Sequence, residues 1–434
     1  MPKRPPIFYG WYLVGLMVIS MMLCYGIRNT FSVFFAPILD DFGWYRGSTA
    51  IMLSLNILVY GMTALLSGSL VDRWKPRRQV FIGIFILAIA TACCSLANQL
   101  WHFYLLFGVL APIGTALCAA PVLNPTIMHW FGKRLGLAIG LGQIGGGLSF
   151  AYGMLIEAVI SHWGWRSSFL VMAGLLIVVL LPLYVFLFRY RPEDKGLKAY
   201  GTSELPTGGE VQETAKAPER DWTVGSAART YNLWFLVIAQ FCYWGTGNYL
   251  ILAHQIKFAE DVGYSSMLAA SVFALFGIVS IAGQLGASIS DKIGREKTVT
   301  IATVLAVGAT IALLSVKDTS QPWLLYVYAI SSGLATGLFS PTIFASVADI
   351  FHGKNIGAIS ALLLAGTGFG GALGPWLGGF IHDVTGSYSI AFIISLASFA
   401  VAGISFWIAA PRNAAKLRAR LQMATKSGAG TNFA

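Results

Sequence analysis

Of the 29 lysines and arginines in this 434-residue chain, Arg28 alone lies deep inside a hydrophobic segment. A guanidinium stays charged in a protein, and holding it in hydrocarbon costs at least ~3 kcal/mol, so such residues generally face a wet cavity. Its planar fork of N–H donors fits a carboxylate, and Asn29 and Thr30 place neutral polar groups beside it. We therefore predict that Arg28 binds an anion that crosses the membrane.

An ion pair with an acid of the same chain is the alternative role for Arg28. The acidic residues within the apolar stretches are Glu157 and Asp349, and Glu157 is nearer to Arg28 in depth. The sequence leaves both roles open, including an alternation in which substrate displaces Glu157. Glu157 and His254 are also the two candidates for carrying a coupled proton, although a histidine near a helix end can simply lie at the membrane interface.

Further polar side chains within the apolar segments could line the same cavity. The seventh segment carries the densest set, in which Tyr243, Asn248 and His254 lie one to three helical turns apart, so several can share one face. For each of these residues, hydrogen bonding to a neighbouring helix is the simpler role. Besides Arg28, the predicted substrate-binding residues are Asn29, Asn56, Tyr60, Asn124, Gln143, Tyr243, Asn248, Gln284 and Tyr328.

The composition is that of an integral membrane protein. Hydrophobic residues make up 56% of the chain and charged residues 11%, whereas soluble proteins average roughly 25% charged residues. The apolar stretches reach the ~20 residues that a membrane-spanning helix needs, and they lack the alternation of barrel strands. The net charge of +11 comes from short basic clusters between apolar segments, so we expect no nucleic-acid partner.

Twelve apolar windows predict an all-α membrane protein with twelve transmembrane helices in two pseudo-symmetric six-helix bundles. The predicted spans are 10–38, 48–71, 79–97, 101–128, 135–160, 165–188, 232–256, 266–289, 298–316, 322–349, 356–381 and 388–410. The predicted domains are an N-terminal bundle (1–190), a cytoplasmic linker (191–231), a C-terminal bundle (232–411) and a cytoplasmic tail (412–434).

The distribution of basic residues predicts the orientation of these helices. The even-numbered loops and both termini carry 24 lysines and arginines, and the odd-numbered loops carry 4. By the positive-inside rule, both termini and the central linker are cytoplasmic. We expect a multi-pass protein of the bacterial cell inner membrane.

The two halves of the sequence repeat, as expected of a transporter built from two related bundles. GSLVDRWKPRR (68–78) recurs as ASISDKIGREK (287–297), FGKRLGLA (131–138) as FHGKNIGAI (351–359), and GLGQIG (140–145) as GTGFGG (366–371). The last pair matches the G-x-G-x-x-G dinucleotide fingerprint. Because neither copy follows a strand, we instead predict that these glycines let helix backbones pack closely.

The segment GSLVDRWKPRR resembles the signature of the major facilitator superfamily between helices two and three, G-x-x-x-D-[RK]-x-G-[RK]-[RK]. Lys75-Pro76 replaces the glycine region of that signature. The resemblance implies that such loops brace the two halves in the outward-open state, while topogenic charge is the alternative. The matching residues are Gly68, Asp72, Arg73, Arg77 and Arg78, with Asp291, Lys292 and Arg295 in a degenerate second copy.

Shorter motifs are similar to the monocarboxylate and oxalate/formate porter branch of that superfamily: FYGWYLV, the following VFF, and FGWYRG in the first outer loop. This resemblance implies transport of small carboxylates with a proton or in exchange. Porters of the branch often place an arginine in helix eight, where this chain has Gly283 and Gln284, and some a lysine in helix eleven, where SALLLAGTGFGG has none. We therefore expect Arg28 to supply the anion-binding charge.

The sequence thus predicts a secondary transporter of a small monocarboxylate-like anion that works by alternating access, as a proton symporter or an exchanger. We expect no enzyme activity, cofactor or metal, because no nucleophile–base arrangement or metal-ligand cluster is visible. The alternatives are a transporter of a larger aromatic or neutral solute, and a receptor of the same fold that binds its ligand without moving it. We expect a monomer surrounded by membrane lipid.

Overall fold

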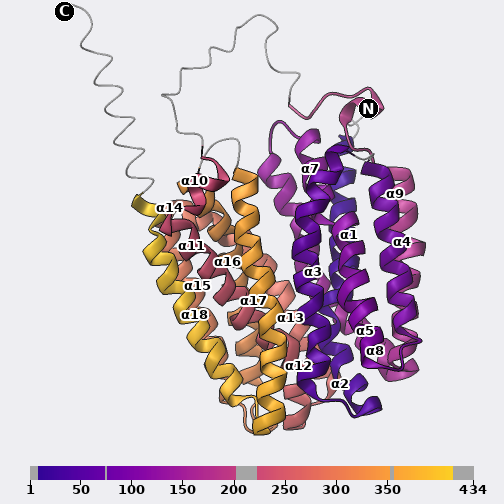
Figure 1. Ribbon diagram of the computed structural model, residues 1–434, viewed down its shortest axis with the longest axis vertical. Coiled ribbons are helices and arrows are strands. Elements are labelled where there is room, and N and C mark those ends of the chain that lie inside the picture. Colours follow the sequence, from indigo (N-terminus) through magenta and orange to yellow (C-terminus); the bar gives the residue numbers. More distant parts are fainter. Residues whose placement is uncertain (1–7, 74–75, 202–221, 352–355, 414–434) are drawn as a thin grey trace, which may run out of the picture.

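The computed structural model describes residues 8–73, 76–201, 222–351 and 356–413, without the side chains of 65 and 68–73. Figure 1 shows two helical bundles side by side, one from each half of the chain. The first helix of each bundle begins at the end where residues 192–201 lie, which we call the linker end. The opposite end is called the far end.

The N-terminal bundle contains the first six predicted spans. Its first span is split at Thr30. Its fourth span is divided among several short elements, because prolines and a π-helical segment interrupt regular helix there. Its elements are α1 (Tyr9–Asn29), α2 (Phe31–Phe42), α3 (Arg46–Arg73), α4 (Pro76–Cys94), α5 (Leu100–Phe103), η1 (Tyr104–Leu110), α6 (Ala111–Cys118), α7 (Ala120–Trp130), α8 (Leu135–Leu175), η2 (Leu176–Leu180) and α9 (Leu181–Leu187).

The C-terminal bundle follows the short elements η3 (Pro192–Lys195) and α10 (Val224–Ala228). Its seventh span contains a nine-residue π-helical segment around two glycines. Its elements are α11 (Tyr231–Gln240), η5 (Phe241–Tyr249), α12 (Leu250–Val262), α13 (Ser266–Gly286), η6 (Ala287–Ile289), α14 (Ser290–Ile293), α15 (Arg295–Leu314), α16 (Trp323–Ile350), α17 (Ile356–Thr385) and α18 (Ser389–Ala409).

The described helices confirm the predicted fold class. Eleven helical segments within the described ranges are long and apolar enough to cross a membrane, and one of them, Leu135–Leu187, has 53 residues, enough for two crossings. Gly164 interrupts this segment with φ 77° and ψ 164°, a conformation that essentially only glycine adopts. The chain turns there, so the segment supplies the fifth and sixth spans and the total is twelve.

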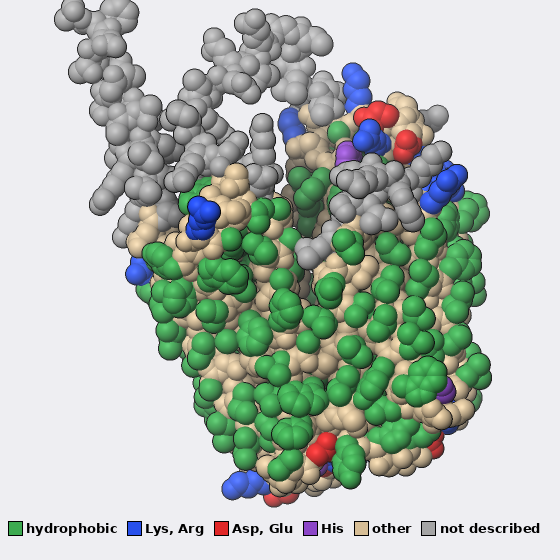
Figure 2. Space-filling model, viewed as in Figure 1, with side chains coloured by type: hydrophobic (Ala, Val, Ile, Leu, Met, Phe, Trp, Pro, Cys, Tyr) green, Lys and Arg blue, Asp and Glu red, His purple; other side chains and the backbone are tan. Residues whose placement is uncertain are grey.

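The surface also fits a membrane-spanning protein. Figure 2 shows hydrophobic side chains covering the middle of the molecule, with the charged side chains gathered at its two ends. Large apolar residues such as Val178, Phe186 and Ile404 are more than 60% exposed, as lipid-facing residues are.

Glycines bring helices into backbone contact, as the sequence predicts for the two glycine hexads. A Cβ added to Gly145 in α8 would meet the carbonyl of Val18 in α1. A Cβ added to Gly374 in α17 would meet the carbonyl of Gly245 in η5. Small residues allow such close crossings within membranes.

Among the described residues, the two bundles contact each other mainly through α3 with α17, α8 with α13, and α2 with α12. Gly147 of α8 lies against Gly277 of α13, and Gly61 of α3 lies against Gly368 of α17. The hydrogen bonds and ion pairs that join described residues of the two bundles lie toward the far end. On the face drawn in Figure 2, the surface is hollowed between the bundles near the linker end.

Candidate functional site

Arg28 occupies the middle of the membrane-spanning region at the boundary between the two bundles. It lies 19 residues after the start of α1 at Tyr9, which places it about 28 Å along the helix. Its side chain is half-buried, and its Nε is buried without a hydrogen-bond partner. Within the described parts of the chain, no carboxylate forms an ion pair with it. The alternative, an ion pair between Arg28 and Glu157, is therefore not formed in this conformation.

Two tyrosines hold the Arg28 guanidinium instead of an acid. The guanidinium carbon lies 4.9 Å from the ring centroid of Tyr25 and 5.2 Å from that of Tyr60. The hydroxyls of these tyrosines are hydrogen-bonded to each other at 2.6 Å. Cation–π contacts of this kind contribute about 0.5–2 kcal/mol each, but they leave the N–H donors of the guanidinium free. The arrangement offers a positioned, unneutralised cation.

The opposite bundle contributes Tyr249, which is close enough to Arg28 to interact with it electrostatically. Tyr249 ends the π-helical segment η5, and its ring centroid lies 5.4 Å from that of Trp244. An added Cβ at Gly371 would lie 3.2 Å from the Tyr249 ring and would also meet Ile57 of the N-terminal bundle. π-Helical turns are frequent at functional sites, because they change which side chains face a cavity.

Most of the predicted polar residues make hydrogen bonds within their own bundle. Asn29 donates to the Ser149 hydroxyl at 2.7 Å, which ties α1 to α8. Asn56 is buried and donates to the carbonyl of Phe107 at 2.7 Å. The remaining bonds are Gln143 to Asn124 at 3.2 Å and Asn248 to the Thr336 hydroxyl at 2.9 Å.

Three further predicted residues lie in the C-terminal bundle, and among the described contacts none joins them to Arg28. Tyr243 is completely buried and stacks on Phe339 with ring centroids 3.6 Å apart. Tyr328 is 1% exposed and borders a small internal void together with Gln255. Gln284 is half-buried near the end of α13.

Glu157 lies seven residues before the turn at Gly164 and therefore closer to the far end than Arg28. Its side chain is 6% exposed, and the described residues give it neither an ion pair nor a hydrogen bond. The charged group that influences it is Glu260 of α12, across the boundary between the bundles. A buried carboxylate without a cation is stabilised by binding a proton.

His254 is completely buried, and both of its ring nitrogens have partners. Nε2 is 2.8 Å from the carbonyl oxygen of Pro375, and Nδ1 is 3.3 Å from the hydroxyl of Tyr388. Because a carbonyl can only accept, Nε2 carries the proton and Nδ1 accepts from the tyrosine. The neutral imidazole thus satisfies both bonds.

The residues of the two signature loops lie at the linker end. Gly68, Asp72 and Arg73 belong to the last turns of α3, but their side chains are outside the described part of the chain. Arg77 donates to the carbonyl of Val185 at 3.1 Å, and Arg295 contacts Asp291 at 2.6 Å and Asp349 at 2.9 Å. The side chains of Arg78 and Lys292 are exposed.

The sequence did not lead us to predict that Tyr25 and Tyr249 lie beside Arg28. Tyr25 lies three residues before Arg28, so helical spacing alone places the two side chains on one face and could have identified it. Tyr249 reaches Arg28 only because the bundles pack together, and no local pattern indicates that. The hydrogen bonds from the backbone of Arg46 and Gly47 to Asp383 at the far end were not predicted either, since they join the two bundles.

Twelve membrane-crossing helices in two bundles, with a charged site between them, define a membrane transport protein. The family model described as Major Facilitator Superfamily matches residues 17–332 and 281–428, and the chain belongs to this family. It is therefore a transport protein and not an enzyme.

Curated relatives resemble the chain over most of its length. Monocarboxylate transporter 13 of Bos taurus is 26% identical over 412 residues, which cover 93% of this chain and 89% of the relative. The oxalate:formate antiporter of Oxalobacter formigenes is 25% identical over 377 residues, which cover 84% of each chain.

A solved structure confirms the fold. A bacterial homolog of the human lysosomal transporter Spinster, in an inward-facing and occupied conformation, matches with a TM-score of 0.72 and 18% identity. The match covers 94% of this chain and 97% of that structure.

Proposed function

We propose that this protein is a secondary active transporter of a small organic anion with a single negative charge, and that it works by alternating access. In this proposal Arg28 contacts the carboxylate of the cargo between the two bundles. Relatives named as monocarboxylate transporters and as an oxalate:formate antiporter support an anionic cargo. Two bundles related by sequence repeats suit a rocking motion around a central site.

The observation that carries the proposal is the unneutralised guanidinium of Arg28. Its Nε is buried without a partner, and the described residues supply no carboxylate to pair with it. An unpaired charge is costly within a membrane protein. We therefore infer that Arg28 pairs with a ligand that binds and dissociates. An anionic cargo is such a partner, because it neutralises the cation while bound.

The charge of the site favours a monoanion over a dianion. Arg28 is the one lysine or arginine deep within the membrane-spanning segments, so a dianion would leave one negative charge unpaired there. The surrounding groups are tyrosine rings, which suit the apolar body of a carboxylate. The same rings also favour the second candidate function, transport of a larger aromatic solute.

Competition between matched solutes tests this proposal. Purified full-length protein in proteoliposomes would take up labelled lactate under an imposed pH gradient, in the presence of lactamide, oxamate or oxalate. Lactamide replaces the carboxylate of lactate by a neutral amide, and oxamate is the singly charged counterpart of oxalate. We expect oxamate to compete at least about tenfold better than oxalate, and lactate better than lactamide by a similar factor.

Equal competition by lactamide and lactate would contradict an anionic cargo and favour the neutral-solute alternative. Saturable lactate binding without uptake would instead identify a receptor of the same fold.

We assign the coupled proton to Glu157 rather than to His254, whose two ring nitrogens already have partners. Glutamine at position 157 has nearly the shape of a permanently protonated glutamate. Glu157→Gln is therefore expected to retain exchange of cargo across the membrane. Net uptake of cargo by this variant should no longer be accelerated by an inward proton gradient. Parallel measurements of exchange and of gradient-driven uptake in proteoliposomes check this.

Glu260→Gln serves as the matched control, since it removes the acidic neighbour of Glu157 and leaves Glu157 itself intact. If Glu157→Gln responded to the proton gradient like the native protein, Glu157 would be rejected as the proton carrier and His254 would become the candidate.

The basic residues support an orientation with the linker end in the cytoplasm, because 24 of the 29 lie in the termini and the even-numbered loops. In that orientation this conformation is closed on the outside. Placement in a bacterial inner membrane, the monomeric state and the domain boundaries remain predictions.

A further inference from the structure

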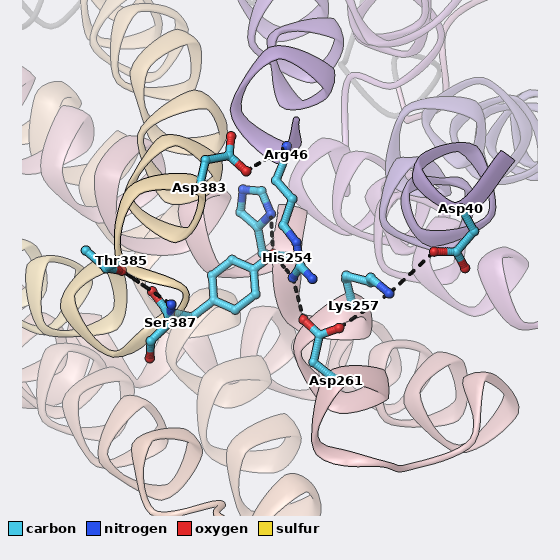
Figure 3. A network of polar contacts seen from close by, with 9 residues as sticks. Asp40, Arg46, His254, Lys257, Asp261, Asp383, Thr385 and Ser387 are labelled. Atoms are coloured by element: carbon cyan, nitrogen blue, oxygen red, sulfur yellow. Dashed lines mark hydrogen bonds and ion pairs between the residues drawn. The ribbon is translucent and has the colours of Figure 1, made fainter. Parts of the chain in front are cut away.

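A cluster of charged residues joins the two bundles at the far end (Figure 3). We call Asp40, Arg46, Lys257, Asp261 and Asp383 the far-end cluster. Asp40 and Arg46 belong to the N-terminal bundle, and the other three belong to the C-terminal bundle. The substrate site described above does not use this cluster, which is separated from Arg28 by the length of α2.

The closest link in the cluster runs from a side chain of one bundle to the backbone of the other. The two carboxylate oxygens of Asp383, in the last turn of α17, accept from the backbone N–H groups of Arg46 at 2.9 Å and Gly47 at 2.7 Å. Arg46 and Gly47 are the first two residues of α3. The first N–H groups of a helix have no partner within it, and the helix dipole there attracts a negative charge. Asp383 therefore caps α3 from the opposite bundle.

The side chains of Arg46 and Lys257 complete the cluster. The Arg46 guanidinium contacts the carboxylate of Asp261 and donates to the hydroxyl of Tyr388 at 2.9 Å. Lys257 lies 3.3 Å from Asp261 and 3.8 Å from Asp40. The cluster has three carboxylates but two cationic side chains. The partial positive charge at the N-terminus of α3 stabilises the third carboxylate, that of Asp383.

Glycine makes this contact between helix ends possible. A Cβ added to Gly379 of α17 would lie 2.6 Å from the carbonyl carbon of Arg46, and one added to Gly47 would lie 3.0 Å from the backbone nitrogen of Phe380. The backbones of α3 and α17 therefore touch at the point where Asp383 reaches across. Opening the far end has to separate these helix ends and break both hydrogen bonds of Asp383.

We propose that Asp383 is a positioning residue of the transport cycle, which holds the far end shut by capping α3 and releases it each time the path opens there. This inference rests on one part of the proposed function, namely that the protein alternates between a conformation open at the linker end and one open at the far end. Asp383 is exposed, and the ion pairs of the cluster are partly exposed, so each ion pair contributes little individually. The Asp383 carboxylate, however, accepts from two backbone N–H groups, and hydrogen bonds to a charged group contribute more.

Distances between spin labels test this without any cargo. Labels would be placed at Leu96 and Lys317, exposed residues in far-end loops of the two bundles, after replacement of the five native cysteines by alanine. Asp383→Asn is expected to raise the ratio of far-end-open to far-end-closed molecules about tenfold or more, the change expected when a charge-assisted hydrogen bond is lost. Asp383→Ala should give the same shift, and Asp383→Glu a smaller one.

Asp41→Asn is the matched control. Asp41 bonds Arg166 at 2.8 Å within the N-terminal bundle, so its removal costs a far-end ion pair that does not cross between bundles. Unchanged distances in both Asp383→Asn and Asp383→Ala would overturn the proposal, as would an equal shift in Asp41→Asn. If the protein transported no carboxylate but the Asp383 variants still shifted the distances, the proposed cargo would be wrong. The proposed role of Asp383 at the N-terminus of α3 would then still hold.

Discussion

Arg28→Gln is expected to reduce carboxylate uptake about 100-fold or more while raising the apparent melting temperature by about 2 °C or more. Uptake falls because glutamine cannot neutralise the carboxylate, and losing one partner of a buried charge pair costs about 2–5 kcal/mol. Stability rises because the cargo-free protein then no longer holds an uncompensated charge between its bundles. A residue with a purely structural role would not give opposite changes in the two quantities.

Proteoliposome uptake and thermal unfolding in the same lipid check both halves of this prediction. Arg28→Lys should retain part of the uptake, because a lysine keeps the charge but loses the planar fork. Arg166→Gln is the control, since that arginine is paired with Asp41 at the surface. It should keep full uptake without a gain in stability. Native uptake by Arg28→Gln would remove Arg28 from the cargo site.

Gly145→Ala is expected to destabilise the N-terminal bundle by about 1–3 kcal/mol, the cost of forcing extra atoms into a packed core. The added Cβ would lie 2.8 Å from the Cβ of Met21 and closer still to the carbonyl oxygen of Val18. The backbone of α1 cannot move aside as the end of a flexible side chain could. α1 would therefore be displaced from α8, together with Arg28, which it carries.

Gly140→Ala provides a control from the same glycine hexad. Gly140 is exposed, and a Cβ added there would meet nothing within 4 Å. This change should be neutral or stabilising by about 0.5–1 kcal/mol, because alanine favours a helix more than glycine does. Thermal unfolding of the two purified variants measures the difference. Equal stabilities for Gly145→Ala and Gly140→Ala would contradict the role assigned to this helix crossing.

The fold could be predicted from local information. Spans of about twenty apolar residues, basic clusters between them and three sequence repeats indicate twelve helices in two related bundles, and the described helices agree. The glycine hexads were also interpretable, because glycine inside a long apolar helix has few roles other than close packing. Breaks within spans, such as those at Thr30 and in η5, were not predicted, since they depend on how neighbouring helices pack.

The candidate site could be predicted only in part. Arg28 is identifiable because an intramembrane charge is so costly that its presence requires a reason. The neighbours of Arg28 are harder to identify. Helical spacing places Tyr25 beside Arg28, but Tyr249 belongs to the other bundle and no local pattern indicates its position. Polar residues such as Asn56 and Asn248 look alike in sequence whether they line a cavity or bond to the next helix, and the structure shows that both of these bond to a neighbouring helix.

The sequence by itself determined the membrane-spanning architecture, the duplication and the single deep cation, because hydrophobic length and the cost of charge act residue by residue. Only the tertiary structure decided that Arg28 has aromatic rather than acidic neighbours, and that Asp383 caps a helix 336 residues away in the chain. Contacts of that kind depend on directions and distances between helices, which arise only when the two bundles have packed together.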